Sequence, residues 1–170
     1  NKINQDKSIT LVQRVIDPNG REIKRLEKNV DLAANSGVTE IDIEGKIASP
    51  QLWSPDSPSL YTIVSEIKDL ETGEILDQVV IPLGFRWFKM DQQKGFFLNG
   101  KHLKLIGVSK HQDYIGLGSA VSNDLLISDL EMIKDMGANC YRSSHYPQDP
   151  SVLDACDRLG LLVLDEIPLV

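Results

Sequence analysis

Three polar clusters contain the residues best suited to chemistry, and each follows an apolar run of the sequence. They are Lys110-His111-Gln112-Asp113, Arg142 with His145-Tyr146, and Asp165-Glu166. Imidazoles, a guanidinium and carboxylates are groups that hold a polar ligand by hydrogen bonds and charge. In parallel α/β proteins, ligands bind at the carboxyl ends of the strands. If the apolar runs are neighbouring parallel strands, the three clusters are predicted to meet at one site.

The residues between and before these clusters are typical of a β-α-β-α-β unit. Strands are predicted over 103–108, 139–144 and 161–164, and the last is entirely apolar, as a strand buried on both faces should be. Short connections between alternating strands and helices indicate the beginning of a parallel sheet. The predicted elements therefore place the clusters at neighbouring strand ends.

Two helices are predicted to connect these strands. The first opens near Ser122-Asn123-Asp124, which are good N-cap residues, and ends at Gly137. The second has Asp149 as its cap and Pro150 at its first position, where a missing N–H costs nothing, and Gly160 closes it. Apolar residues recur at helical spacing in both segments, so each helix is expected to bury one face.

Residues 1 to 88 alternate between apolar and polar in short runs separated by turns. Strands are predicted at 9–16, 38–43, 60–70 and 75–83, and this spacing favours an antiparallel β-sandwich. Trp53, in a proline-rich crossing, is predicted to pack over the sandwich core. Aromatic strand pieces begin at Gly84, and Asn99-Gly100 is a strong hairpin signal. The domain boundary is therefore predicted near residues 86–92.

The composition is that of an ordinary globular protein, and it argues against some classes of partner. The net charge is -7 with no Lys/Arg run, and no apolar run approaches the roughly 20 residues of a membrane helix. We therefore expect neither a nucleic-acid partner nor a membrane-spanning segment. Cys140 and Cys156 form no metal or disulfide pattern and are expected to be buried thiols. No metal or cofactor is predicted.

Five motifs occur along the chain in a recognisable order. They are Phe96-Phe97-Leu98-Asn99-Gly100-Lys101, Gly107-Val108-Ser109-Lys110-His111-Gln112-Asp113, Arg142-Ser143-Ser144-His145-Tyr146-Pro147, Cys156-Asp157-Arg158-Leu159-Gly160 and Asp165-Glu166-Ile167-Pro168. Together they make the chain resemble glycoside hydrolase family 2, which contains β-galactosidases, β-glucuronidases and β-mannosidases. The resemblance covers nearly the whole chain. It implies an immunoglobulin-like β-sandwich over 1–88 and the first part of a TIM (β/α)8 catalytic barrel over 89–170.

The resemblance implies retaining chemistry, in which one glutamate is the acid/base and another the nucleophile. Their carboxyl groups stand about 5–5.5 Å apart. In the family they lie on the fourth and seventh barrel strands, the first within an Asn-Glu pair. This chain stops after the third predicted strand and contains no Asn-Glu pair. We therefore interpret it as a piece of a longer enzyme, with no catalytic residue of its own and no activity alone.

The resemblance also implies roles in substrate binding. Arg142 is implied to hold the nucleophile carboxylate, which its planar fork suits, and His111 and His145 to contact the sugar. Adjacent strand residues point to opposite faces, so only one of Asp165 and Glu166 is expected to line the pocket, paired with a cation such as Arg142. The alternative for this pair is a purely structural ion pair at a strand end.

The substrate is expected to be a carbohydrate. Ser109 and Gln112 stand where many members have Asn and Glu, and the His-Gln-Asp form resembles certain bacterial β-galactosidases. β-Galactosides are therefore favoured; a β-glucuronidase, a β-mannosidase or a non-catalytic carbohydrate-binding or structural module are the alternatives. The parent is a candidate homo-oligomer, and its compartment, cytoplasmic or periplasmic/secreted, is left open. The unpaired apolar strand at 161–164 is expected to make this chain self-associate.

Overall fold

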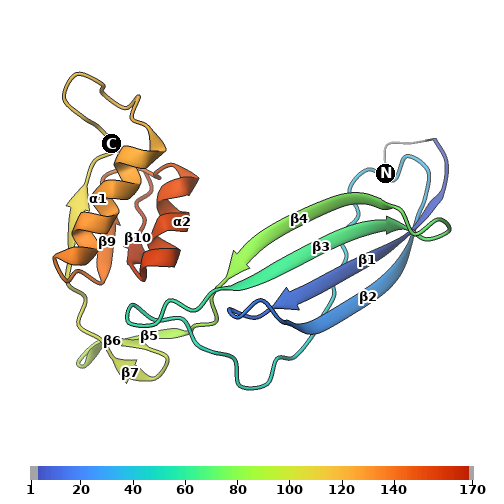
Figure 1. Cartoon of the computed structure of the whole chain (residues 1–170), viewed down its shortest axis with the longest axis horizontal. Coiled ribbons are helices and arrows are strands. Elements are labelled where there is room, and N and C mark those ends of the chain that lie inside the picture. The colour runs from blue at the N-terminus through green and yellow to red at the C-terminus, as the bar shows by residue number, and fades with distance from the viewer. Residues whose placement is uncertain (1–3, 169–170) are drawn as a thin grey trace. The chain divides into compact units, whose positions relative to one another are not determined.

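The computed structural model describes residues 4–168, which form two compact units (Figure 1). Within the described residues, unit 1 comprises 4–50 and 60–83, and unit 2 comprises 51–59 and 84–168. Unit 2 contains all three polar clusters. Neither α-helix in this part of the chain has the length and apolar character needed to cross a membrane.

Unit 1 is built on one antiparallel sheet of four strands in the order β2-β1-β3-β4. The strands are β1 (Lys7–Ile16), β2 (Glu22–Leu32), β3 (Tyr61–Asp69) and β4 (Ile75–Leu83). Three of them confirm the strands predicted from alternation. Strand β2 is not predicted from alternation, because it is an edge strand with charged residues on both faces and lacks a clear apolar alternation.

The two faces of this sheet differ in character. The register places Leu11 opposite Ile67, and Val15 opposite Ile63, on one apolar face.

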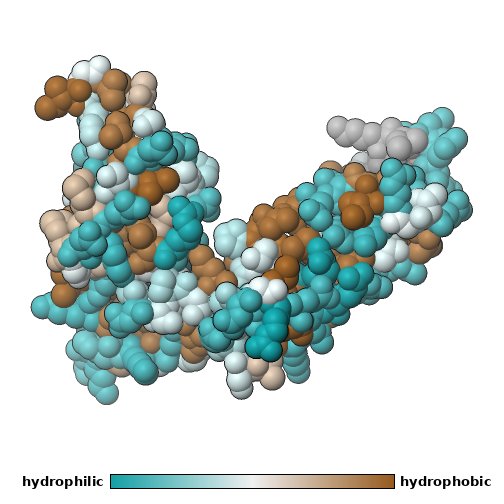
Figure 2. Space-filling model, viewed as in Figure 1, coloured by the Kyte–Doolittle hydropathy of each residue, from teal (hydrophilic) through white to brown (hydrophobic). Residues whose placement is uncertain are grey.

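The predicted strand at 38–43 is wrong: this segment has no strand ladder, although Ile41 and Ile43 are half-buried as the alternation requires. Strand β4 is exposed along its whole length, and Figure 2 shows an apolar area over it.

Unit 2 begins with a short antiparallel sheet, β5 (Phe88–Asp91), β6 (Gly95–Leu98) and β7 (Lys101–His102). The predicted Asn99-Gly100 turn joins β6 to β7, with positive φ values of 51° and 79° that these residue types tolerate. The Asn99 side chain also accepts a hydrogen bond from the Trp87 N–H and donates one to the Trp53 carbonyl. The turn thus ties the hairpin to the rest of unit 2.

The predicted β-α-β-α-β order is confirmed. Its elements are β8 (Gly107–Lys110), α1 (Asn123–Asp135), β9 (Cys140–Ser143), α2 (Pro150–Leu159) and β10 (Leu162–Leu164), and the parallel strands lie in the order β10-β9-β8. The strand predicted at 103–108 starts later than expected. The Asn139 side chain accepts a hydrogen bond from the Ile106 N–H and donates one to the Lys104 carbonyl. These backbone groups therefore bond to a side chain instead of to the backbone of a neighbouring strand.

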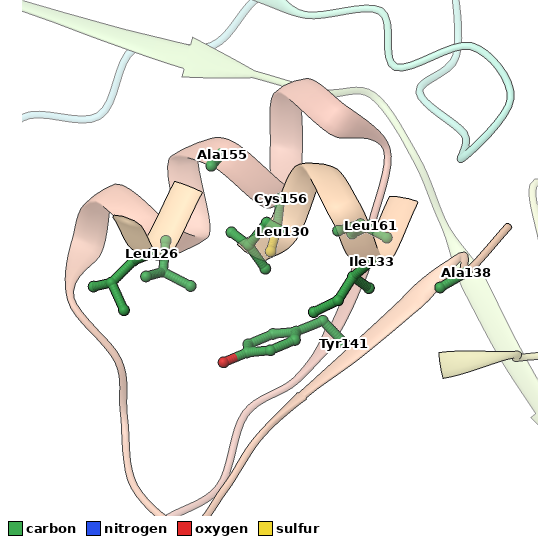
Figure 3. Close-up of a cluster of buried hydrophobic side chains, with 9 residues drawn as sticks. Leu126, Leu130, Ile133, Ala138, Tyr141, Ala155, Cys156 and Leu161 are labelled. Atoms are coloured by element: carbon green, nitrogen blue, oxygen red, sulfur yellow. The ribbon is translucent and has the colours of Figure 1, made fainter. Parts of the chain in front are cut away.

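Helices α1 and α2 pack against each other and against β9 around one buried cluster (Figures 1 and 3). It contains Leu126, Leu130 and Ile133 of α1, Cys156 of α2, and Tyr141 of β9. Burial of each large apolar side chain contributes about 1.5–3 kcal/mol. Gly160 ends α2 in the left-handed conformation, as predicted. This core holds the two strand-to-helix crossovers in place.

The prediction that Trp53 packs over the sandwich core is wrong, because Trp53 belongs to unit 2. Its ring is only 1% exposed, its Nε1–H donates to the Asp157 carbonyl at 2.8 Å, and the Arg86 guanidinium lies 4.4 Å from the ring centroid. Lys134 of α1 donates to the Pro55 carbonyl at 2.9 Å. We call residues 51–59 the strap, since they fasten onto the helical layer.

Candidate functional site

The parallel register brings the three polar clusters to one edge of the β8-β9-β10 sheet. Ser109, Arg142 and Leu164 are direct neighbours across the three strands. The residues that follow them therefore leave the sheet at the same edge. A hollow of about 290 Å³ lies beside Arg142 on this sheet, lined by Leu105, Gly107, Val108, Ser109, Cys140, Arg142 and Leu164.

The Glu166 carboxylate stands between two cationic or potentially cationic groups. Its Oε1 accepts from Nε and Nη2 of Arg142, and its Oε2 lies 2.8 Å from Nδ1 of His145. The His145 hydrogen bond, and then that of Arg142, hold the pKa of Glu166 below its usual range, against the opposing effect of burial. Glu166 is thus kept ionised and fixed in place, which suits a positioning group better than a proton donor.

Asp165 points to a different partner, in agreement with the alternation of strand residues. Its Oδ1 accepts from the Ser143 hydroxyl at 2.6 Å, and the same hydroxyl oxygen accepts from the Glu166 N–H at 3.1 Å. Ser143 is fully buried. Ser143 is not among the site residues predicted from the sequence. Its position gave a signal, because Ser143 must point to the face opposite Arg142, and Asp165 must point to the face opposite Glu166.

The two predicted histidines lie next to each other, although they come from different loops. The rings of His111 and His145 are 5.2 Å apart between centroids and nearly perpendicular, at 79°. The Tyr146 ring lies 6.0 Å from that of His111. Both imidazoles are largely exposed, so their edges remain accessible to a ligand.

Lys110 belongs to the first cluster in sequence but points toward helix α1. Its Nζ lies 2.9 Å from Oδ2 of Asp129. A hydrogen bond to the same Asp129 raises the pKa of Tyr114. Lys110 therefore anchors the chain after β8 rather than facing the imidazoles. Among the described residues, no three His, Cys, Asp or Glu side chains gather into a group that would hold a metal ion.

Both parts of the chain match models of one enzyme family. Residues 1–86 match the model described as glycosyl hydrolases family 2, and residues 89–170 match its TIM barrel domain. The chain belongs to glycoside hydrolase family 2. Its parallel strands β8 to β10 are accordingly the start of that barrel, and the candidate site lies at their carboxyl ends, where such barrels carry their active sites.

Two relatives show how much of a family 2 protein this chain covers. It is 36% identical to beta-galactosidase BoGH2A of Bacteroides ovatus over 98% of the chain and 19% of that protein. It is 35% identical to a beta-glucuronidase of Bacteroides fragilis over 94% of the chain and 23% of that protein. The chain thus spans about one fifth of the length of these relatives.

A solved structure of the family agrees closely with this fold. The beta-glucuronidase of Bacteroides uniformis superposes with a TM-score of 0.94 at 37% identity, over 99% of this chain and 20% of that one. Both galactosidases and glucuronidases are therefore among the family 2 relatives. Sugar binding by His111, Arg142, His145, Asp165 and Glu166 stays a prediction. The structure brings four of them into contact with one another, whereas Asp165 binds Ser143 instead.

Proposed function

We propose that the chain is the part of a retaining β-glycosidase that supplies the floor of the sugar site. The observation that carries the proposal is the strand-end cluster in which Glu166 joins Arg142 to His145 beside His111. In support of the proposal, the cluster lies at the carboxyl ends of parallel strands, the end at which TIM barrels carry their active sites. The acid/base and nucleophile glutamates would come from later strands of the parent, so the chain alone is expected to be inactive.

Arg142 is proposed to hold the nucleophile carboxylate of the parent. A guanidinium has five N–H donors, and Glu166 accepts from only two of its nitrogens. The side chain is about half exposed, at 49%, so the remaining donors can reach a second carboxylate. Glu166 would fix the orientation of the guanidinium, in the way that a hydrogen-bonded carboxylate orients a metal-binding histidine in metalloproteins.

His145 and His111 are proposed to bind sugar hydroxyl groups. With Nδ1 of His145 directed at the Glu166 carboxylate, the proton of a neutral ring is held on Nδ1, and Nε2 is left as an acceptor. A sugar hydroxyl can donate to that nitrogen. Asp165 is proposed to act indirectly, because its bond to Ser143 fixes the backbone from which Glu166 projects.

A β-galactoside is the first candidate substrate. The Lys110 side chain at the end of β8 forms an ion pair with Asp129, and Arg142 is proposed to bind the nucleophile carboxylate, so neither is assigned to a charged sugar. A neutral sugar needs no further cation, whereas the carboxylate of a glucuronide does. The second candidate is a β-glucuronide, favoured by the Bacteroides relatives, one of which is described as covalently bound to cyclophellitol-6-carboxylate aziridine.

The domain organisation is part of the same proposal. We infer that the antiparallel sheet of unit 1 belongs to the immunoglobulin-like sandwich of the family, predicted over 1–88, before the barrel at 89–170. The apolar face of the sheet supports this inference, since Ile9, Val15 and Tyr61 are buried there while Val79 and Ile81 remain half exposed. Carbohydrate is the expected partner, with no nucleic acid or membrane.

The test is hydrolysis of chromogenic β-galactoside, β-glucuronide and β-mannoside by the full-length parent and its variants. Arg142→Ala and His145→Ala are each expected to lower kcat/KM by about 100-fold or more, because each removes a group that orients reacting atoms. Arg21→Ala and His102→Ala, both on exposed turns or hairpins, serve as matched controls. A parent that cleaves none of the three sugars would argue against a glycosidase of this kind, and full activity in both site variants would refute the assigned roles.

A further inference from the structure

The loops that carry His111 and His145 are joined by a pair of hydrogen bonds centred on Gln112. The Gln112 backbone N–H donates to the Tyr146 hydroxyl at 3.1 Å. The Gln112 side-chain Oε1 accepts from the Asp149 backbone N–H at 3.0 Å. One residue thus reaches the second loop at two points, through its main chain and its side chain. We call Gln112 with Tyr146 and Asp149 the loop clamp.

The far side of the loop clamp is rigid. Asp149 is the N-cap of α2, and its carboxylate accepts from the Ser151 N–H at 2.9 Å. Gln148 is 7% exposed and accepts from the hydroxyl of the buried Tyr141 at 3.2 Å. The helix start and the core beneath it therefore hold the atoms to which Gln112 is bound.

The segment that carries Gln112 needs such an anchor. Most of residues 111–120 are exposed, and only Gln112 and Tyr114 among them are half-buried. Its first residue, His111, contacts His145 and Tyr146 only through ring edges, at centroid distances of 5.2 and 6.0 Å. Exposed segments with few buried contacts open most readily, so hydrogen bonds to a rigid helix have a large effect on them.

We propose that Gln112 and Tyr146 are positioning residues that fix the separation of the His111 and His145 imidazoles, and thereby set the spacing of the two contacts to the sugar. This inference rests on the proposed function. A displacement of about 1 Å in a group that orients substrate lowers the rate by up to about 100-fold. The loss is expected in kcat as well as KM, because misplaced imidazoles orient the sugar poorly even when it is bound.

The test uses the full-length parent with Gln112→Met, which removes the acceptor at similar size, and Tyr146→Phe, which removes the hydroxyl. Gln112→Glu keeps an acceptor oxygen, and its charge lies near a helix N-terminus, so it should rescue function. Gln93→Met is the matched control on an exposed turn of unit 2. Steady-state kinetics are measured on the sugar that the wild type cleaves, and amide exchange is followed in all variants.

Gln112→Met and Tyr146→Phe are each expected to lower kcat/KM by about 10- to 100-fold. Gln112→Glu and Gln93→Met should stay within about threefold of the wild type. Exchange should quicken at the Asp149 amide in Gln112→Met and at the Gln112 amide in Tyr146→Phe. Wild-type kinetics in both removing variants would overturn the positioning role. Unchanged exchange at both amides would overturn the loop clamp itself, even if the parent cleaves none of the sugars. A wild type without activity would count against the proposed function, and faster exchange would then still support the clamp.

Discussion

Replacement of Trp53 by alanine should destabilise unit 2 and leave unit 1 folded. Trp53 is 1% exposed, its indole N–H donates to the Asp157 carbonyl of α2, and Arg86 stacks over its ring. Removal of a buried aromatic side chain of this size costs about 3–5 kcal/mol. Loss of the hydrogen bond leaves a carbonyl group at the end of α2 without its donor, which costs about 1–3 kcal/mol when that group stays buried.

The assay is amide exchange of the 170-residue chain followed by mass spectrometry of peptides. A loss of 3–5 kcal/mol corresponds to about two to four orders of magnitude faster exchange at amides that open only when the unit unfolds. This increase is expected in peptides of α1 and α2, and not in those of β1 to β4. Trp53→Phe should give a smaller increase at the same places, because it keeps most of the apolar contact.

Trp87→Ala is the matched control, since Trp87 is 55% exposed and its loss should change stability by less than about 1 kcal/mol. The opposite pattern, with faster exchange in β1 to β4 and protected helices, would refute the assignment of the strap to unit 2. It would restore the expectation that Trp53 covers the core of the sandwich.

Three further predictions concern charge, thiols and association. Lys68 foremost, followed by Gln78 and Arg14, lowers the pKa of Glu66. The stabilisation by ionised Glu66 is therefore present above its unfolded-state pKa and is lost as the pH falls through the lower folded-state pKa. Glu66→Gln should therefore reduce the urea midpoint at about pH 7, and the difference from the wild type should shrink as the pH is lowered below the unfolded-state pKa of about 4.5; a constant difference would argue against this charge effect. Burial raises the pKa of the Cys156 thiol to about 12, so iodoacetamide at about pH 8 should modify it only in the unfolded chain, and rapid native modification would be inconsistent with its burial. The isolated chain should self-associate through the open edges of the β8-β9-β10 sheet and the exposed β4, and a strictly monomeric mass by light scattering at high concentration would oppose this.

The sequence by itself determined the parallel unit and the approximate location of its site. Asp149, Pro150 and Gly160 mark α2 because capping and backbone conformation depend on neighbouring residues alone. The same local chemistry made Asn99-Gly100 readable as a turn. The order of strands and helices then required the polar clusters to share one edge, since parallel strands end together.

Only the tertiary structure decided which side chains meet at that edge. Asp165 and Glu166 are neighbours in sequence, yet one binds Ser143 and the other joins Arg142 to His145, which depends on the register of three strands. Gln112 reaches Asp149 across 37 residues of sequence. Trp53 reaches Asp157 across 104, although its local pattern favoured the sandwich. Such contacts are set by packing between distant segments, and no local pattern of residue types encodes them.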